Sequence, residues 1–316
     1  MTLYYINQGS GLWNDSNNWF QDQAGTIPNG AVPTGSDDCE INAGNTVDEI
    51  QSSGYNTVIN YGTVTTNNGT ANVTNASGGV ITTNPQIVDS NSGTVVTNDS
   101  TVNNNYGLVT TNSVGATVTI NAGGTVTTNN GTINTNQGSS TVTTNNGTID
   151  NNNFGASVTT NASGAIVTNN YGTVTTNSGT VSDNKSGSTV TTNANGGVVS
   201  SNDGTVTTNS SGGTVTTNNS GIVTTNASGG AVTSNSGSAT VTTNSGNINS
   251  NYGTVTTNSS SGSVSSNYGT VTTNNGTVQL VGNIGGGTGS ITATSSFNIS
   301  GMTAGTNVTF PLPRVW

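Results

Sequence analysis

Single β-branched residues recur along the chain at short intervals, and most of them open a phrase of the form V-x-x-N. From Val64 to Val278, neighbouring anchors of this kind lie mostly 7 or 9 residues apart, in units such as VTTNNGT. Short runs of β-branched residues that alternate with polar ones, bounded by Gly and Asn, are typical of strands and turns. Each unit therefore predicts one short β-strand and one turn.

The units fall into two alternating classes. Starting at Val64, every second anchor opens a nearly invariant phrase, VTTN or ITTN, whereas the units between them open with variable phrases such as VDSN, IDNN and VSSN. The true repeat is thus two units long, and Val174, Val190 and Val206 are 16 residues apart. This pattern predicts an all-β, two-sided β-solenoid of about 16 residues per rung, where a rung is one full circuit of the chain, with about 14 rungs.

Local chemistry gives the expected orientation of the side chains. In the segment T-V-T, an inward Val places the Thr on each side of it outward, because side chains alternate along a strand. Gly and Asn follow at once, and we expect both at turns where the chain needs a positive φ. One side of the solenoid is then invariant and the other is variable.

Energetics explain why the phrase is repeated. A rung buries two β-branched side chains, at about 1.5–3 kcal/mol each, while ordering ~16 residues costs about 1–2 kcal/mol per residue. Rungs stacked ~4.8 Å apart pair their backbone groups and align like residues into Val and Asn ladders, giving a rod roughly 65 Å long. Both ends of such a stack need caps. We therefore assign residues 1–49 to an N-terminal cap or attachment module, 50–278 to the repeats and 279–316 to a C-terminal β cap or attachment segment.

Composition and charge exclude several classes of function. Only 4% of the 316 residues are charged and 28% are hydrophobic, and the net charge of −10 includes just two cations, Lys185 and Arg314. Nucleic-acid binding needs clustered cations, so no nucleic-acid partner is expected. The single Cys39 permits no internal disulfide. No signal peptide is visible and no run approaches the ~18 apolar residues of a membrane span, so membrane insertion is not expected.

The N-terminal segment carries a recognisable set of residues: Trp13, Asn18, Trp19, Pro33, Asp37 or Asp38, and Ile41. In this order and spacing they resemble a module at the head of many bacterial surface proteins and phage fibre proteins, where it leads into a β-helix. The last nine residues, VTFPLPRVW, are similar to the ends of some phage structural proteins. The resemblance implies a virion or cell-surface fibre and does not imply an enzyme.

The invariant side supplies the candidate binding residues. Nine rungs carry a Thr on each side of the anchor, which predicts a flat, uncharged array of methyl and hydroxyl groups that resembles the T-x-T array of β-solenoid ice-binding proteins. An equally simple interpretation is that Thr is a soluble β-former, and the same side could pack against sister chains. The predicted residues are Thr63, Thr65, Thr125, Thr127, Thr141, Thr143, Thr173, Thr175, Thr189, Thr191, Thr205, Thr207, Thr240, Thr242, Thr254, Thr256, Thr270 and Thr272.

Other candidate chemistry is sparse. The Tyr residues in NYG phrases suit either stacking on the sugar rings of a host glycan or covering of the turn backbone, and the second role is favoured. Asp38 and Glu40 share one strand face but are too few to ligate Ca²⁺, so no metal is expected. The chain has no His, and the acids of the repeat are isolated, so we expect no catalytic residue and no cofactor.

These observations favour a structural or adhesive fibre component, located on a virion or outside a cell. Its expected partners are copies of itself, other virion or surface proteins that contact the end caps, and host glycan. The alternative is an ice-binding protein that uses the flat Thr array.

Overall fold

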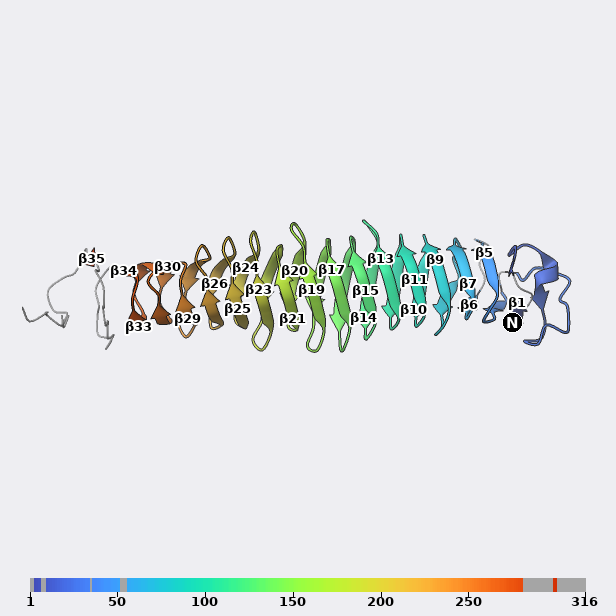
Figure 1. Cartoon of the computed structure of the whole chain (residues 1–316). Coiled ribbons are helices and arrows are strands. Elements are labelled where there is room, and N and C mark those ends of the chain that lie inside the picture. Colours follow the sequence, from blue (N-terminus) through green and yellow to red (C-terminus); the bar gives the residue numbers. More distant parts are fainter. Residues whose placement is uncertain (1–2, 7–9, 35, 52–55, 281–297, 300–316) are drawn as a thin grey trace, which may run out of the picture. The chain divides into compact units, whose positions relative to one another are not determined.

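The computed structural model describes residues 3–6, 10–34, 36–51, 56–280 and 298–299. Within these ranges the chain consists of β-strands and loops, and its only helical segment is the short 3-10 turn η1 (Ser16–Asn18). The chain forms two compact units, Met1–Thr175 and Thr176–Trp316. From β4 to β34 the strands alternate between two sheets: even-numbered strands form sheet A and odd-numbered strands form sheet B (Figure 1).

The first unit contains the beginning of both sheets. Its sheet A comprises β1 (Leu3–Ile6), β3 (Trp19–Phe20), β4 (Asp38–Ile41), β6 (Thr57–Asn60), β8 (Asn72–Asn75), β10 (Ile87–Asn91), β12 (Thr101–Asn105), β14 (Thr117–Ala122), β16 (Thr132–Gln137), β18 (Thr148–Asn152) and β20 (Ile166–Asn170). Its sheet B comprises β2 (Ser10–Gly11), β5 (Thr46–Ile50), β7 (Thr63–Asn67), β9 (Val80–Asn84), β11 (Thr94–Asn98), β13 (Leu108–Asn112), β15 (Thr125–Asn129), β17 (Thr141–Asn145) and β19 (Ser157–Asn161). The next sheet B strand, β21 (Thr173–Asn177), contains the boundary between the units.

The second unit repeats the arrangement. Its sheet A comprises β22 (Thr180–Asn184), β24 (Val198–Asn202), β26 (Thr214–Asn218), β28 (Ala231–Asn235), β30 (Asn247–Asn251), β32 (Ser263–Asn267), β34 (Thr277–Leu280) and β35 (Asn298–Ile299). Its sheet B comprises β23 (Thr189–Asn193), β25 (Thr205–Asn209), β27 (Ile222–Asn226), β29 (Thr240–Asn244), β31 (Thr254–Asn258) and β33 (Thr270–Asn274).

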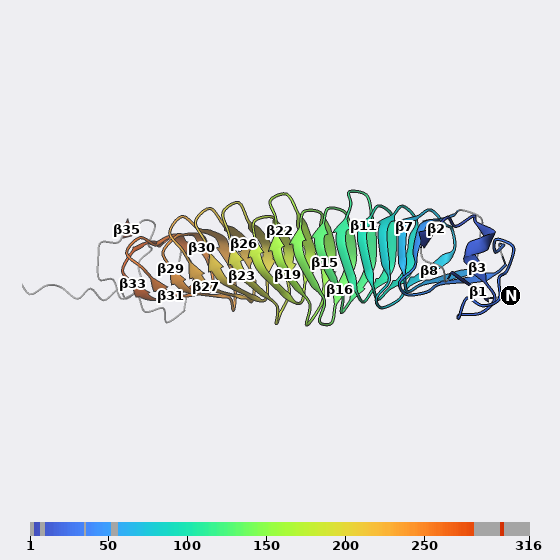
Figure 2. The ribbon, with the colours of Figure 1, turned by 45° about the vertical axis from the view of Figure 1, so that its right-hand side comes forward.

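Register confirms the two-sided solenoid. Val126 on β15 pairs with Val109 on β13 and with Val142 on β17, so each strand lies parallel to the strand one full rung away and not beside its neighbour in sequence. One rung takes about 16 residues, as predicted. The rungs number about 15, because β4 and β5 already pair in register with β6 and β7. Loops that leave sheet A, called A-to-B loops here, and loops that leave sheet B, called B-to-A loops, connect the sheets at opposite edges of each unit (Figure 2).

The strand interior departs from simple alternation. In β17, which reads TVTTN, the second residue Val142 and the fifth residue Asn145 are both fully buried, while the residues between them are not. Strict period-two alternation would bury the fourth residue instead. The pairing register agrees, because it omits the third residue of each such strand, as between β15 and β17. The chain therefore bends within the strand, and the third and fourth residues both lie on the outer surface.

The strand-final Asn is a core residue, which corrects the expectation that it occupies a turn with positive φ. In the described part of the chain, only glycines have a positive φ. Asn129 illustrates the role: its Nδ2 donates to Oδ1 of Asn145 at 2.7 Å and to the backbone oxygen of Thr148 at 3.2 Å. The same Nδ2-to-Oδ1 bond links successive rungs in both sheets of each unit, always from the earlier rung to the later one. The predicted Asn ladders thus exist, and they run inside the solenoid.

The N-terminal segment folds around two tryptophans. Trp13 and Trp19 are fully buried, with ring centroids 4.7 Å apart at an interplanar angle of 83°, and Nε1 of Trp19 donates to the backbone oxygen of Trp13 at 2.9 Å. Ile41 on β4 and Ile50 on β5 pair with Asn60 and Asn67, so apolar side chains end both Asn ladders on this side. The predicted C-terminal cap, 279–316, lies outside the described residues except for the end of β34 and β35.

Candidate functional site: the threonine face of sheet B

The predicted threonines lie together on one sheet. All eighteen occupy the first or third position of a sheet B strand, and none is buried. In the first unit the third-position column, taken from β7 to β19, contains Thr65, Thr82, Val96, Thr110, Thr127, Thr143 and Thr159. In the second unit the same column, from β23 to β33, contains Thr191, Thr207, Thr224, Thr242, Thr256 and Thr272. β21 contributes Thr173 and Thr175.

A further column of threonines was missed by the sequence analysis. The fourth position of every sheet B strand from β7 onward is Thr, and the bend within the strand turns it outward beside the third position. Its members are Thr66, Thr83, Thr97, Thr111, Thr128, Thr144 and Thr160 in the first unit and Thr192, Thr208, Thr225, Thr243, Thr257 and Thr273 in the second, with Thr176 on β21. The signal in the sequence was the invariance of the second Thr in V-T-T-N. Its outward direction depends on the burial of the strand-final Asn, because two buried residues three positions apart cannot both follow period-two alternation.

The three outward columns together are called the Thr face; Val80, Leu108, Ser157 and Ile222 interrupt its first column and Val96 interrupts its third. Register places like columns in adjacent rungs directly beside each other, for example Thr128 with Thr111 and Thr144. Rungs repeat at ~4.8 Å, and first and third positions are about 6.7 Å apart along a strand. Thr has few side-chain rotamers in a strand, so the methyl and hydroxyl groups are held in a regular array.

The Thr face is free of charge. No Asp, Glu, Lys or Arg occurs in the sheet B strands from β7 to β33. The acids of the repeat strands lie on sheet A instead: Asp89 on β10, Asp150 on β18 and Asp183 on β22. Asp183 forms a salt bridge with Lys185 at 3.0 Å. A surface of hydroxyl and methyl groups without charge is suited to contact with another flat, uncharged and periodic surface.

Sheet A does not form a comparable array. Its fourth-position residues vary from rung to rung, with Ser90 on β10, Asn104 on β12, Ile120 on β14 and Asp183 on β22. Both sheets bury the same Val and Asn pattern, so the fold alone does not require one of them to be uniform outside. The invariance of the fourth position in sheet B is therefore a property of its outer surface.

The polar residues of the N-terminal segment have structural partners. Asp38 Oδ1 accepts a hydrogen bond from Asn56 at 2.8 Å, and Glu40 Oε1 accepts one from Gln23 at 3.0 Å. Burial raises the pKa of the Glu40 carboxyl and of the Cys39 thiol above their usual ranges. Among the residues that the structure describes, no group of three or more His, Cys, Asp or Glu side chains could hold a metal ion.

Exposed aromatic residues gather on one type of loop. Between residues 56 and 280, every aromatic side chain lies on an A-to-B loop. Tyr252 and Tyr268, on loops one rung apart, stack with ring centroids 4.7 Å apart and an interplanar angle of 5°. The others are Tyr61, Tyr106, Phe154 and Tyr171.

The fold and the Thr face together define a parallel, two-sheet β-solenoid of tandem repeats with one uncharged, Thr-rich outer face. No protein-family model, curated protein or solved structure matches this chain at a significant level. In the described ranges, no helix has the length and apolar character needed to cross a membrane.

Proposed function

We propose that this chain is a structural or adhesive fibre component of a virion or of an extracellular surface. The observation that carries the proposal is the ladder construction of both units, in which Val and Asn residues of each rung contact the same residues one rung before and after. Such a stack gains stability from nearest-neighbour contacts and presents the same outer groups at every rung.

The proposal includes partners and location. Copies of the chain are its first expected partners, because the Thr face is uncharged and rich in Thr and can therefore oppose a second Thr face. Other virion or surface proteins would bind through the terminal segments, since the Trp-containing N-terminal fold lies outside the regular rungs. A non-catalytic role accords with the isolated acids of the repeat strands.

The experiment is mass spectrometry of purified virions, and of surface appendages sheared from cells, taken from the source of the sequence. We expect the chain in one of these fractions together with other structural proteins and in many copies. A chain recovered only from the cell interior, in a culture where known structural proteins are detected in the particles, would refute the fibre assignment.

Ice binding is a second candidate function, favoured by the three-column Thr face. The decisive assay is ice shaping and thermal hysteresis with the purified chain and two variants at matched third positions. Thr127→Lys places a charge in the Thr face of β15, and Thr119→Lys places one on sheet A strand β14. Ice binding predicts activity in the wild type and in Thr119→Lys and its loss in Thr127→Lys; no ice shaping by the wild type would exclude it.

A further inference from the structure

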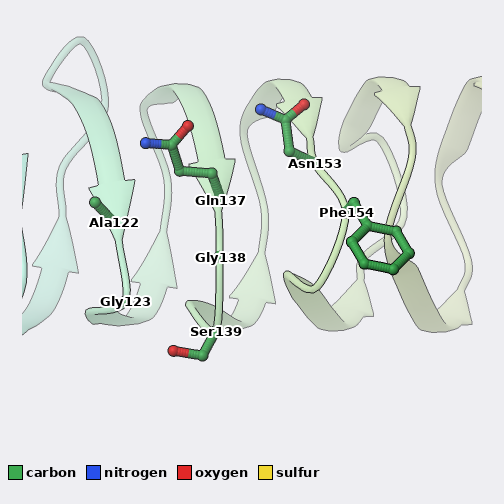
Figure 3. Close-up of a pocket in the computed structure, with 7 residues that line it drawn as sticks. All are labelled: Ala122, Gly123, Gln137, Gly138, Ser139, Asn153 and Phe154. Carbon is green, nitrogen blue, oxygen red and sulfur yellow. The ribbon is translucent and has the colours of Figure 1, made fainter.

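A groove crosses three successive A-to-B loops of the first unit, on an edge of the solenoid that the Thr face does not include. Its volume is about 510 Å³, and its lining comes from the ends and loops of β14, β16 and β18. Figure 3 shows Gln137 and Asn153 one rung apart, with their side chains extended in the same direction; the ring of Phe154 extends the other way, on the side of Asn153 that is away from Gln137. The lining contains no charged residue.

Phe154 is the most unusual member of the groove. Its side chain is 84% exposed, whereas Tyr61, Tyr106 and Tyr171 on the other A-to-B loops of this unit are 40–54% exposed. A ring that covers the loop backbone would lose much of its exposure, so Phe154 does not serve that role. Covering an exposed aromatic ring removes apolar surface from water, and this gain is available to a ligand.

The polar groups of the groove suit the same kind of ligand as the aromatic ring. The carboxamides of Gln137 and Asn153 each offer both donors and an acceptor, and Ser139 adds a hydroxyl. Rungs are ~4.8 Å apart, so two planar amides follow one another along the groove, and the flat apolar ring lies at its end. Vicinal sugar hydroxyls pair with carboxamides, and the C–H face of a pyranose packs on an aromatic ring.

Glycines keep the groove open. Gly123 and Gly138 both adopt positive φ, of 87° and 67°, and a Cβ at Gly138 would meet no atom within 4 Å. The space above the loops is therefore not filled by protein in this unit. The absence of charge from the lining, in a chain of net charge −10, favours an uncharged ligand over an anionic one.

We infer that the Phe154 groove binds neutral carbohydrate, with Phe154 as the stacking platform and Gln137 and Asn153 as the hydrogen-bonding residues. The inference stands on this groove and not on the Thr face or on the fibre assignment. Binding by the purified chain therefore tests it separately from the particle experiment.

The test uses the purified full chain and titration calorimetry, supported by saturation-transfer NMR, against hexasaccharides of glucose, mannose, galactose and N-acetylglucosamine and against an anionic uronic-acid hexasaccharide. We expect binding of at least one neutral probe and weaker binding of the anionic one. Phe154→Ala should weaken binding about tenfold or more, and Gln137→Ala should weaken it by a smaller factor.

The matched control is Val114→Ala, because Val114 is 85% exposed and lies on a B-to-A loop of the same unit. This variant should bind as the wild type does, and circular dichroism of all variants should be unchanged because the substituted side chains are on the surface. The inference is overturned if no neutral probe binds, or if Phe154→Ala binds as well as the wild type. It is also overturned if Phe154→Ala leaves carbohydrate binding unchanged and alters only the sedimentation coefficient of the chain. That result would mean that the groove contacts a second copy of the chain.

Discussion

Asn129 donates a hydrogen bond from Nδ2 to Oδ1 of Asn145 at 2.7 Å, across one rung of the solenoid, and both side chains are fully buried. Asn112 makes the same bond to Asn129 from the preceding rung. Each amide is therefore a donor to one neighbour and an acceptor from the other. A buried amide that lost either partner would keep its desolvation cost without compensation, so the ladder fixes Asn at this position in the rungs between its apolar ends.

Replacement of Asn129 by Ala should destabilise the first unit by about 2–4 kcal/mol, because Asn145 Oδ1 loses its donor and Asn112 Nδ2 loses an acceptor. The matched control is Asn146→Ala, which removes an exposed bond from Asn146 to Asn130 of 2.9 Å and should change stability by less than about 0.5 kcal/mol. Hydrogen exchange of the β15 and β17 backbone amides measures the change in stability in both variants. Equal protection in the two variants would show that the buried ladder does not stabilise the rungs.

The short loops between strands require glycine where successive rungs approach closely. A Cβ on Gly147 would lie 2.1 Å from the backbone oxygen of Gly131 in the preceding rung, so Gly147→Ala must push two rungs apart and should cost about 3 kcal/mol or more. Gly138→Ala is the control: its Cβ has open space, and only the positive φ opposes it, at about 1–2 kcal/mol. Thermal unfolding of the two variants distinguishes close approach from backbone strain. A larger loss at Gly138 would contradict the rung spacing.

Much of this architecture follows from the repeat alone. The buried Val series and its alternation between two classes predict two sheets and the length of the rung, because each rung needs one inward β-branched residue per side. The role of Asn129 does not follow, since Asn is common both in turns and in amide ladders, and only the stacking of the rungs in the structure separates the two. The fourth-position residue Thr128 was missed for a related reason: alternation is the usual rule for strands, and the bend that breaks it depends on burying Asn129. The Phe154 groove depends on loop conformation, which the repeat pattern does not specify.

Glu40 makes the stability of the N-terminal segment depend on pH. Burial raises the pKa of its carboxyl, while the hydrogen bond from Gln23 lowers it in part. The folded state therefore binds more protons than the unfolded state just above the usual Glu pKa of about 4.3, and stability falls as the pH rises through the raised pKa. Glu40→Gln removes this loss and keeps an acceptor for Gln23. We expect a higher Tm than wild type at pH 7 and no difference near pH 4; a lower Tm at pH 7 would mean that the ionised form is the stabilised one.

Cys39 provides a chemical probe of the same segment. The thiol is fully buried, and burial with Asp37 and Asp38 nearby raises its pKa, so little reactive thiolate is present in the folded chain. We expect iodoacetamide at pH 8 to leave Cys39 unmodified in the native protein and to alkylate it in guanidinium chloride. The denaturant dependence of alkylation, followed by mass spectrometry, reports the opening of β4. Rapid labelling of the native chain would contradict the packing of β4 against β1 and β6.

The outward position of Thr128 can be tested by stability alone, whatever the Thr face contacts. If the fourth residue of β15 lies on the surface, as the burial of Val126 and Asn129 on either side indicates, Thr128→Lys should change the free energy of unfolding by no more than about 0.5 kcal/mol. Thr127→Lys at the third position should behave alike, and Val126→Lys should prevent folding of the unit, because an ammonium group cannot be buried unpaired. Chemical denaturation of the three variants measures these effects. A loss of several kcal/mol in Thr128→Lys would mean that the strand keeps strict alternation and that the fourth column points inward, and the Thr face would then reduce to its first and third columns.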